Sequence, residues 1–161
     1  MLSSEVLSVF MKSFVEKLKK VGKLALVPIS KPINDAYLRK SSSNLESAKI
    51  LLASHKLEES VVFAYYAMYN CLLALLFSCG IKSENHAVSI ELLGFFDKKL
   101  QQSIAFAKKE RIDKQYYIDF KLTKKDANDM IIKAEDFTVR CQLLINGLTE
   151  EIIQRIQKEV K

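Results

Sequence analysis

The longest stretch of the chain without a charged residue runs from Val61 to Cys79, reads VVFAYYAMYNCLLALLFSC, and covers 19 residues. A helix of this length is long enough to cross a bilayer. Three tyrosines and Asn70 lie within it, and such groups are disfavoured in the middle of a membrane span. A helix that is apolar on all sides is also what the centre of a helical bundle requires. We therefore expect Val61–Cys79 to form a buried central helix and expect no membrane association.

Composition favours an all-α fold. The 161 residues contain only 4 Gly and 2 Pro, too few turn formers for a barrel or a sandwich. Hydrophobic residues make up 49% of the chain and charged residues 27%, which is a globular balance. The length suits one domain with a core that needs no metal or disulfide to support it. We predict an up-and-down four- to five-helix bundle with an extra N-terminal amphipathic helix.

Two segments are expected. Residues 1–33 form an N-terminal amphipathic helix (5–21, ending at Gly22) and a loop between Pro28 and Pro32, and residues 34–161 form the helical bundle. The N-terminal helix is expected to dock on the core or on a second copy, with a membrane-surface or partner-binding arm as the alternative.

Start and stop signals divide the bundle into helices. The second helix is expected to begin at Asn34 or Asp35 and end near His55, with Ser41–Ser43 weakening its first turns. The third runs from Glu58 to Gly80. Ser83 is expected to cap the fourth, which contains His86. Residues 97–122 show weaker periodicity, which leaves room for a break, and Thr123 with Asp126 resembles a capping box before the clearest amphipathic helix. A short last helix follows Thr149.

The cysteines and histidines show no metal-site spacing. Cys71, Cys79 and Cys141 form no CxxC pair, and the two histidines are 31 residues apart, so we expect no zinc and no cofactor. Cys71 and Cys141 lie on apolar helical faces, as buried free thiols do. No secretory signal is visible, and a reducing cytoplasm is the expected location.

Positive charge is concentrated in two stretches. The net charge is +6, and residues 82–125 carry 10 basic against 6 acidic side chains. Residues 1–33 carry 6 Lys against 2 Glu. Such an excess fits a partner that carries phosphates, and it also fits an ordinary solvated surface.

Several motifs, taken in order, resemble one family. The segment AYYAMY (Ala64–Tyr69) is followed by an apolar run, by a glycine, and by His86 early in the next helix. Arg111-x4-Tyr116 and a helix with Ala134 and Phe137 come later. This order resembles the HEPN (higher-eukaryote and prokaryote nucleotide-binding) domains, in particular their small stand-alone archaeal and bacterial members, over about residues 34–147.

The resemblance implies a helical bundle that often forms a homodimer. Many members partner a minimal nucleotidyltransferase, and others are metal-independent ribonucleases. The nucleases use an arginine and a histidine separated by about four to six residues and assembled across the dimer. Here Arg111 is present, but Tyr116 stands where the histidine would be, and Phe63 stands where an arginine commonly precedes AYYA.

The missing histidine argues against catalysis. An imidazole titrates near 6.5 and a phenol near 10, so Tyr116 is a poor base at neutral pH. In the sequence, no arginine stands at the required spacing before His55 or His86. We therefore favour a non-catalytic protein, and if there is any catalysis we assign it to Arg111 and Tyr116.

The candidate ligand-binding residues combine basic and aromatic side chains, which can hold phosphates and stack on bases. They are Tyr65, Tyr66, Asn70, His86, Lys108, Lys109, Arg111, Tyr116 and Tyr117. For Tyr65, Tyr66 and Tyr69 we favour packing in the core with each hydroxyl hydrogen-bonded over a surface that binds a base, and Tyr66 could share a hydrogen bond with Asn70. His86, near a helix start, is expected to be a neutral imidazole that bonds its neighbours, and the lysines could be a solvated face.

The function predicted from sequence is a non-catalytic, dimeric HEPN-like module that binds a nucleotide or RNA or docks a nucleotidyltransferase, as toxin–antitoxin-like proteins do. The alternatives are a metal-independent ribonuclease with a degenerate Arg111–Tyr116 site and a purely structural dimerisation protein.

Overall fold

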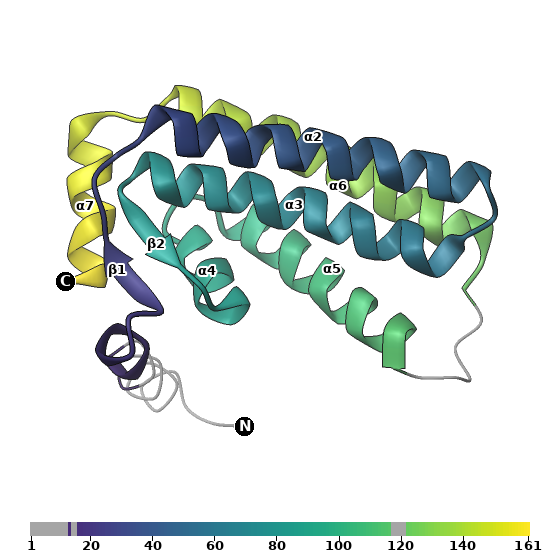
Figure 1. Cartoon of the computed structure of the whole chain (residues 1–161), viewed down its shortest axis with the longest axis horizontal. Coiled ribbons are helices and arrows are strands. Elements are labelled where there is room, and N and C mark those ends of the chain that lie inside the picture. Colours follow the sequence, from purple (N-terminus) through teal and green to yellow (C-terminus); the bar gives the residue numbers. More distant parts are fainter. Residues whose placement is uncertain (1–12, 14–15, 117–121) are drawn as a thin grey trace.

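The computed structural model describes residue 13, residues 16–116 and residues 122–161, without the side chains of residues 112–116. Within these ranges the chain is an all-α bundle with one small two-stranded sheet (Figure 1). Its elements are β1 (Leu24–Leu26), α2 (Lys31–Ala53), α3 (Leu57–Ser78), β2 (Ile81–Ser83), α4 (His86–Leu93), α5 (Lys98–Tyr116), α6 (Lys124–Asn146) and α7 (Glu150–Val160). The all-α prediction is confirmed.

Helix α3 lies at the centre of the bundle. It pairs with α2 in a long antiparallel hairpin and is covered by α6 and α5 (Figure 1). It is long and apolar enough to cross a membrane, but 78% of its most apolar 18-residue window is buried within the protein. The burial of α3 supports a core helix rather than a membrane span.

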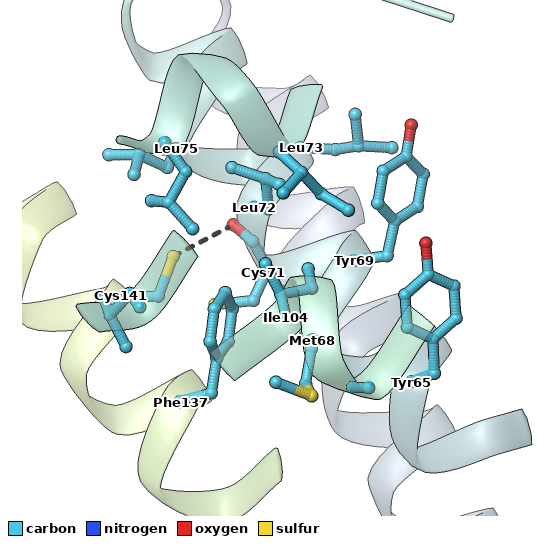
Figure 2. Close-up of a cluster of buried hydrophobic side chains, with 14 of the residues drawn as sticks. Tyr65, Met68, Tyr69, Cys71, Leu72, Leu73, Leu75, Ile104, Phe137 and Cys141 are labelled. Atoms are coloured by element: carbon cyan, nitrogen blue, oxygen red, sulfur yellow. Dashed lines mark hydrogen bonds between the residues drawn. The ribbon is translucent and has the colours of Figure 1, made fainter. Parts of the chain in front are cut away.

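The two sides of α3 contact different partners. On one side Phe137 and Cys141 of α6 pack near Cys71 and Leu72, and on the other the rings of Tyr65 and Tyr69 lie together (Figure 2). The Cys141 thiol donates to the Cys71 carbonyl oxygen over 3.5 Å (Figure 2). Cys71, Cys79 and Cys141 are all buried free thiols. The prediction that Cys71 and Cys141 behave as small hydrophobic residues is confirmed.

The turns at the ends of α3 match the sequence signals. His55, between α2 and α3, has φ of 58°, and Gly80, after α3, has φ of 67°. A Cβ atom at Gly80 would lie 2.7 Å from the Val27 carbonyl oxygen, so this position requires glycine for both its conformation and its packing.

Two helix starts differ from the prediction. Helix α2 begins at Lys31 rather than at Asn34 or Asp35, because Pro32 lies in its first turn, where the missing N–H costs nothing. Ser83 does not cap α4: it lies in β2, and the side chain of Asn85 accepts the capping bond from the Val88 N–H.

The later helix boundaries follow side-chain caps. The break expected within residues 97–122 does not interrupt α5, which is one continuous helix from Lys98 to Tyr116. The chain turns earlier, between α4 and α5, where the Asp97 carboxylate accepts bonds from the N–H groups of Lys99 and Leu100. Thr123 and Asp126 form the predicted capping box of α6, and Thr149 caps α7.

The small sheet joins the N-terminal segment to the bundle, and the sequence analysis did not predict it. β1 pairs antiparallel with β2, with Leu24 opposite Ser83. Residues 16–20 are helical, Leu18 is buried, and the helix ends at Gly22 as predicted. Most of the predicted helix 5–21 falls outside the described residues. The division at residue 33 stays a prediction.

Candidate functional site

Four of the predicted ligand-binding residues come together from three helices. Tyr65 and Tyr66 belong to α3, His86 begins α4, and Arg111 lies near the end of α5. The Tyr65 hydroxyl lies 2.6 Å from Nδ1 of His86, and a guanidinium nitrogen of Arg111 donates to the Tyr66 hydroxyl over 3.1 Å. We call Tyr65, Tyr66, Tyr69, His86 and Arg111 the arginine–histidine cluster.

Arg111 is held against two aromatic rings. Its guanidinium carbon lies 5.3 Å from the ring centre of Tyr65 and 5.5 Å from that of Tyr66, which is within cation–π range. Its Nε is buried and has no hydrogen-bond partner within the described part of the chain. A buried donor without a partner is costly in a folded protein, so Nε of Arg111 is a donor that a ligand could satisfy.

His86 is fixed by its place at the start of α4. Asn85 caps this helix, and the ring of Tyr69 stacks on the imidazole at 3.7 Å between ring centres. Burial, and then the positive charges of Arg111 and Lys108, lower the pKa of His86 below its ordinary value. The imidazole is therefore neutral at pH 7, in a region of positive potential.

Tyr65 and Tyr69 are parts of the core. Tyr65 is 0% exposed and Tyr69 is 6% exposed, so neither ring presents a face to an incoming base. Burial raises the pKa of both hydroxyls, which keeps them protonated. The Tyr69 hydroxyl lies 3.3 Å from the Ser89 hydroxyl, which in turn donates to Ser83 over 2.8 Å.

The contacts around His86 could not be predicted from the sequence. Ser83 was expected to cap α4 and instead lies in β2, and Ser89 carried no signal, because a small polar residue in a helix resembles any exposed position. The spacing of Tyr65 and Tyr69, one turn apart on α3, did place their rings side by side, but the helix crossing that brings His86 against Tyr69 is a tertiary contact.

The other candidate ligand-binding residues differ in burial and in the partners they contact. Lys108 is partly buried, and its positive charge helps to lower the pKa of His86, whereas Lys109 is exposed. Asn70 donates to the Tyr66 carbonyl oxygen on its own helix over 2.8 Å, so the expected side-chain pair between Asn70 and Tyr66 is not formed. The side chain of Tyr116, and the whole of Tyr117, lie outside the described residues.

The cluster is suited to an anionic ligand. Arg111 offers a buried N–H and a fixed positive charge, and Tyr66 and His86 add groups that donate or accept hydrogen bonds. No group of three or more His, Cys, Asp or Glu side chains that could hold a metal ion occurs in the described ranges. The chemistry that these residues offer is binding of a phosphate or carboxylate.

These observations define a class: an all-α bundle whose buried central helix carries tyrosines that hold an arginine and a histidine from two neighbouring helices. The family model of the HEPN domain matches residues 35–144, more than half of the chain. The chain belongs to the HEPN domain family, and this membership makes it a nucleotide- or RNA-related module in general terms. None of the curated proteins compared with it gives a significant match.

Proposed function

We propose that the protein is a non-catalytic module that binds a nucleotide or RNA, with a phosphate held by Arg111. The observation that carries this proposal is the buried Nε of Arg111, which has no partner within the described residues. A phosphate oxygen would accept from Nε and from a terminal nitrogen together, as guanidinium groups commonly bind phosphates.

The surroundings of Arg111 support an anion rather than a cation or an apolar ligand. Lys108 adds a second positive charge close to His86. The Tyr66 hydroxyl accepts from Arg111 and keeps its own proton for a ligand oxygen. Tyr66 and His86 are also only partly buried, so this edge of the cluster is open to solvent.

The test is the binding of a fluorescently labelled single-stranded RNA, and of a nucleotide, followed by anisotropy at two salt concentrations. Losing a charged hydrogen bond costs about 1.5–3 kcal/mol. Arg111→Ala should therefore weaken binding about 10- to 150-fold. It should also reduce the slope of log affinity against log salt by about 0.7 for each single-strand phosphate that the variant no longer neutralises.

Lys109→Ala is the matched control, because it removes the same charge from the same helix at an exposed position. An exposed ion pair contributes up to about 1 kcal/mol, so this variant should lose less than about fivefold. Equal losses in the two variants would mean that only net charge matters. If neither RNA nor nucleotide binds at low salt, ligand binding is wrong and docking of a nucleotidyltransferase or a second copy is the alternative.

A second candidate function, RNA cleavage without a metal, is favoured by one observation: His86 lies in the cluster of Arg111. The folded chain brings a histidine beside the arginine although the spacing in sequence does not. A neutral imidazole can accept the proton of a ribose 2′-hydroxyl while that oxygen attacks the phosphorus, and the bond from phosphorus to the 5′-oxygen of the next nucleotide breaks. The products are a 2′,3′-cyclic phosphate and a 5′-hydroxyl, whose proton comes from the imidazolium or from water. Arg111 would stabilise the charge on the phosphate.

The two candidates differ in what His86 does. If the protein only binds, His86→Gln leaves an RNA ladder unchanged and changes affinity little. If it cleaves, the wild type cuts RNA in the presence of a chelator and His86→Gln and Arg111→Ala both abolish the cutting. An uncut ladder with the wild type would exclude the second candidate under those conditions.

A further inference from the structure

A cavity of about 240 Å³ lies at the end of the bundle where α2 begins and α3 and α6 end. Figure 1 shows these ends together beside α7. The apolar wall of the cavity is formed by Ile29, Ile145, Leu148 and Ile153. The cavity is distinct from the arginine–histidine cluster and shares no residue with it.

The polar side of this cavity contains an incompletely bonded amide. Asn34 donates from Nδ2 to the Ser78 hydroxyl over 2.5 Å, and that hydroxyl donates in turn to the Ala74 carbonyl oxygen. Oδ1 of Asn34 is buried and has no partner in the part of the chain that the structure describes. Because Ser78 already donates to the backbone, turning the amide over would leave its NH₂ group unpaired instead. Either way, Asn34 holds a hydrogen-bonding group that a ligand could satisfy.

A second polar group lies at the start of α2. The Ser30 hydroxyl does not cap the helix and makes no hydrogen bond to another described residue. Lys31 is next to it, with a side chain 82% exposed that forms an ion pair with Asp35. In the first turn of α2 the N–H groups of Lys31 and Ile33 have no preceding helical carbonyl to bond, whereas Pro32 has no N–H and Asn34 donates to the Ser30 carbonyl oxygen. The helix dipole adds positive potential there. This side of the cavity therefore favours a carboxylate.

We propose that this cavity binds a small aliphatic α-amino acid. Its carboxylate lies against Ser30 and Lys31, its ammonium group donates to Oδ1 of Asn34, and its side chain packs on Ile145 and Ile153. The volume is below the usual range of about 300–1,000 Å³ for ligand pockets, so it suits a molecule of this size and excludes a nucleotide.

The test uses the full-length protein and L-leucine as the probe, followed by calorimetry and by backbone amide NMR shifts. We expect saturable binding, with shifts confined to residues 30–34, residue 78 and residues 145–153. Leucinamide lacks the carboxylate and 4-methylpentanoate lacks the ammonium group, and each should bind at least about tenfold more weakly, as expected for losing a charged hydrogen bond.

Two variants test the residues. Asn34→Ala should weaken leucine binding at least about tenfold, whereas Asn44→Ala, the same change farther along α2 and outside the cavity, should leave binding unchanged. If Asn34→Ala fails to fold, Ser30→Ala replaces it, because the Ser30 hydroxyl makes no bond that the helix depends on.

The proposal is overturned if leucine gives no saturable shifts at millimolar concentration. It is also overturned if leucine, leucinamide and 4-methylpentanoate bind equally, or if the shifts fall outside the cavity. Since RNA binding depends on Arg111 and leucine binding on Asn34, failure of one proposal leaves the other standing.

Discussion

Replacing Phe137 by alanine is the most direct test of the packing between α6 and the central helix α3. Phe137 is 0% exposed and lies between α3 and α5, near Met68, Leu72 and Ile104 (Figure 2). Phe137→Ala should leave a cavity in the middle of the core. The cost combines the lost transfer free energy of the ring with the empty volume that remains.

Substitutions of buried Phe by Ala cost about 3–5 kcal/mol, and the full burial of Phe137 places it in that range. For a chain of this size each 1 kcal/mol lowers the melting temperature by about 2–4 °C, which predicts a fall of about 6–20 °C. The free energy of unfolding is measured by urea denaturation and the melting temperature by calorimetry or circular dichroism.

Phe106 provides the matched control, because it is 47% exposed on the neighbouring helix α5. The Lys133 ammonium lies 5.5 Å from the centre of its ring, an interaction that contributes about 0.5–1 kcal/mol. Phe106→Ala should therefore cost less than half as much as Phe137→Ala. Equal costs, or a loss below about 1 kcal/mol for Phe137→Ala, would refute the core that we describe.

Three further predictions concern pH, a turn and a cap. Folding lowers the pKa of His86, so the free energy of unfolding should fall as the pH drops through the ordinary histidine value of about 6.5. His86→Gln should flatten this dependence in urea titrations across that range, and an unchanged slope would contradict it. Gly80→Ala should cost at least about 1–2 kcal/mol, because φ is 67° and the Cβ would meet a backbone oxygen. Gly147→Ala, at φ of −91°, should be neutral or stabilise by up to about 1 kcal/mol, and similar melting temperatures for the two variants would contradict the reasoning. Thr123→Ala removes the cap of α6 and should cost about 1 kcal/mol in urea denaturation, whereas no loss would mean that the capping box contributes nothing.

The sequence predicted the helices because their signals are local. The uncharged run in α3, the capping box at Thr123 and the stop at Gly80 depend on a few neighbouring residues, and each was found where expected. The β1–β2 pair was missed because three-residue strands are too short to show periodicity, and their partner is distant in the sequence. Ser41 shows the same limit: it weakened the prediction of α2, yet its buried hydroxyl donates to the Ala67 carbonyl oxygen on α3.

Because Ser83 was predicted to be the cap of α4, His86 was also predicted at the wrong position in that helix. Counted from Ser83, His86 would be the third residue of its helix, but capping by Asn85 makes it the first. At that position the imidazole lies against Tyr69 and within reach of the Tyr65 hydroxyl. A search for an arginine at fixed spacing before a histidine could not find this pair, because the arginine comes later in the chain and on another helix.

The cluster therefore depends on the tyrosines of α3 more than on a linear motif. Tyr65 and Tyr66 are adjacent in the sequence, so on a helix their side chains leave the axis about 100° apart. One reaches His86 of α4 and the other reaches Arg111 of α5, and the cation lies within about 5.5 Å of both ring centres. Two consecutive tyrosines on a buried helix thus join a histidine and an arginine that no spacing rule relates. The same geometry explains how a chain without the usual histidine after its arginine can still place an imidazole beside it.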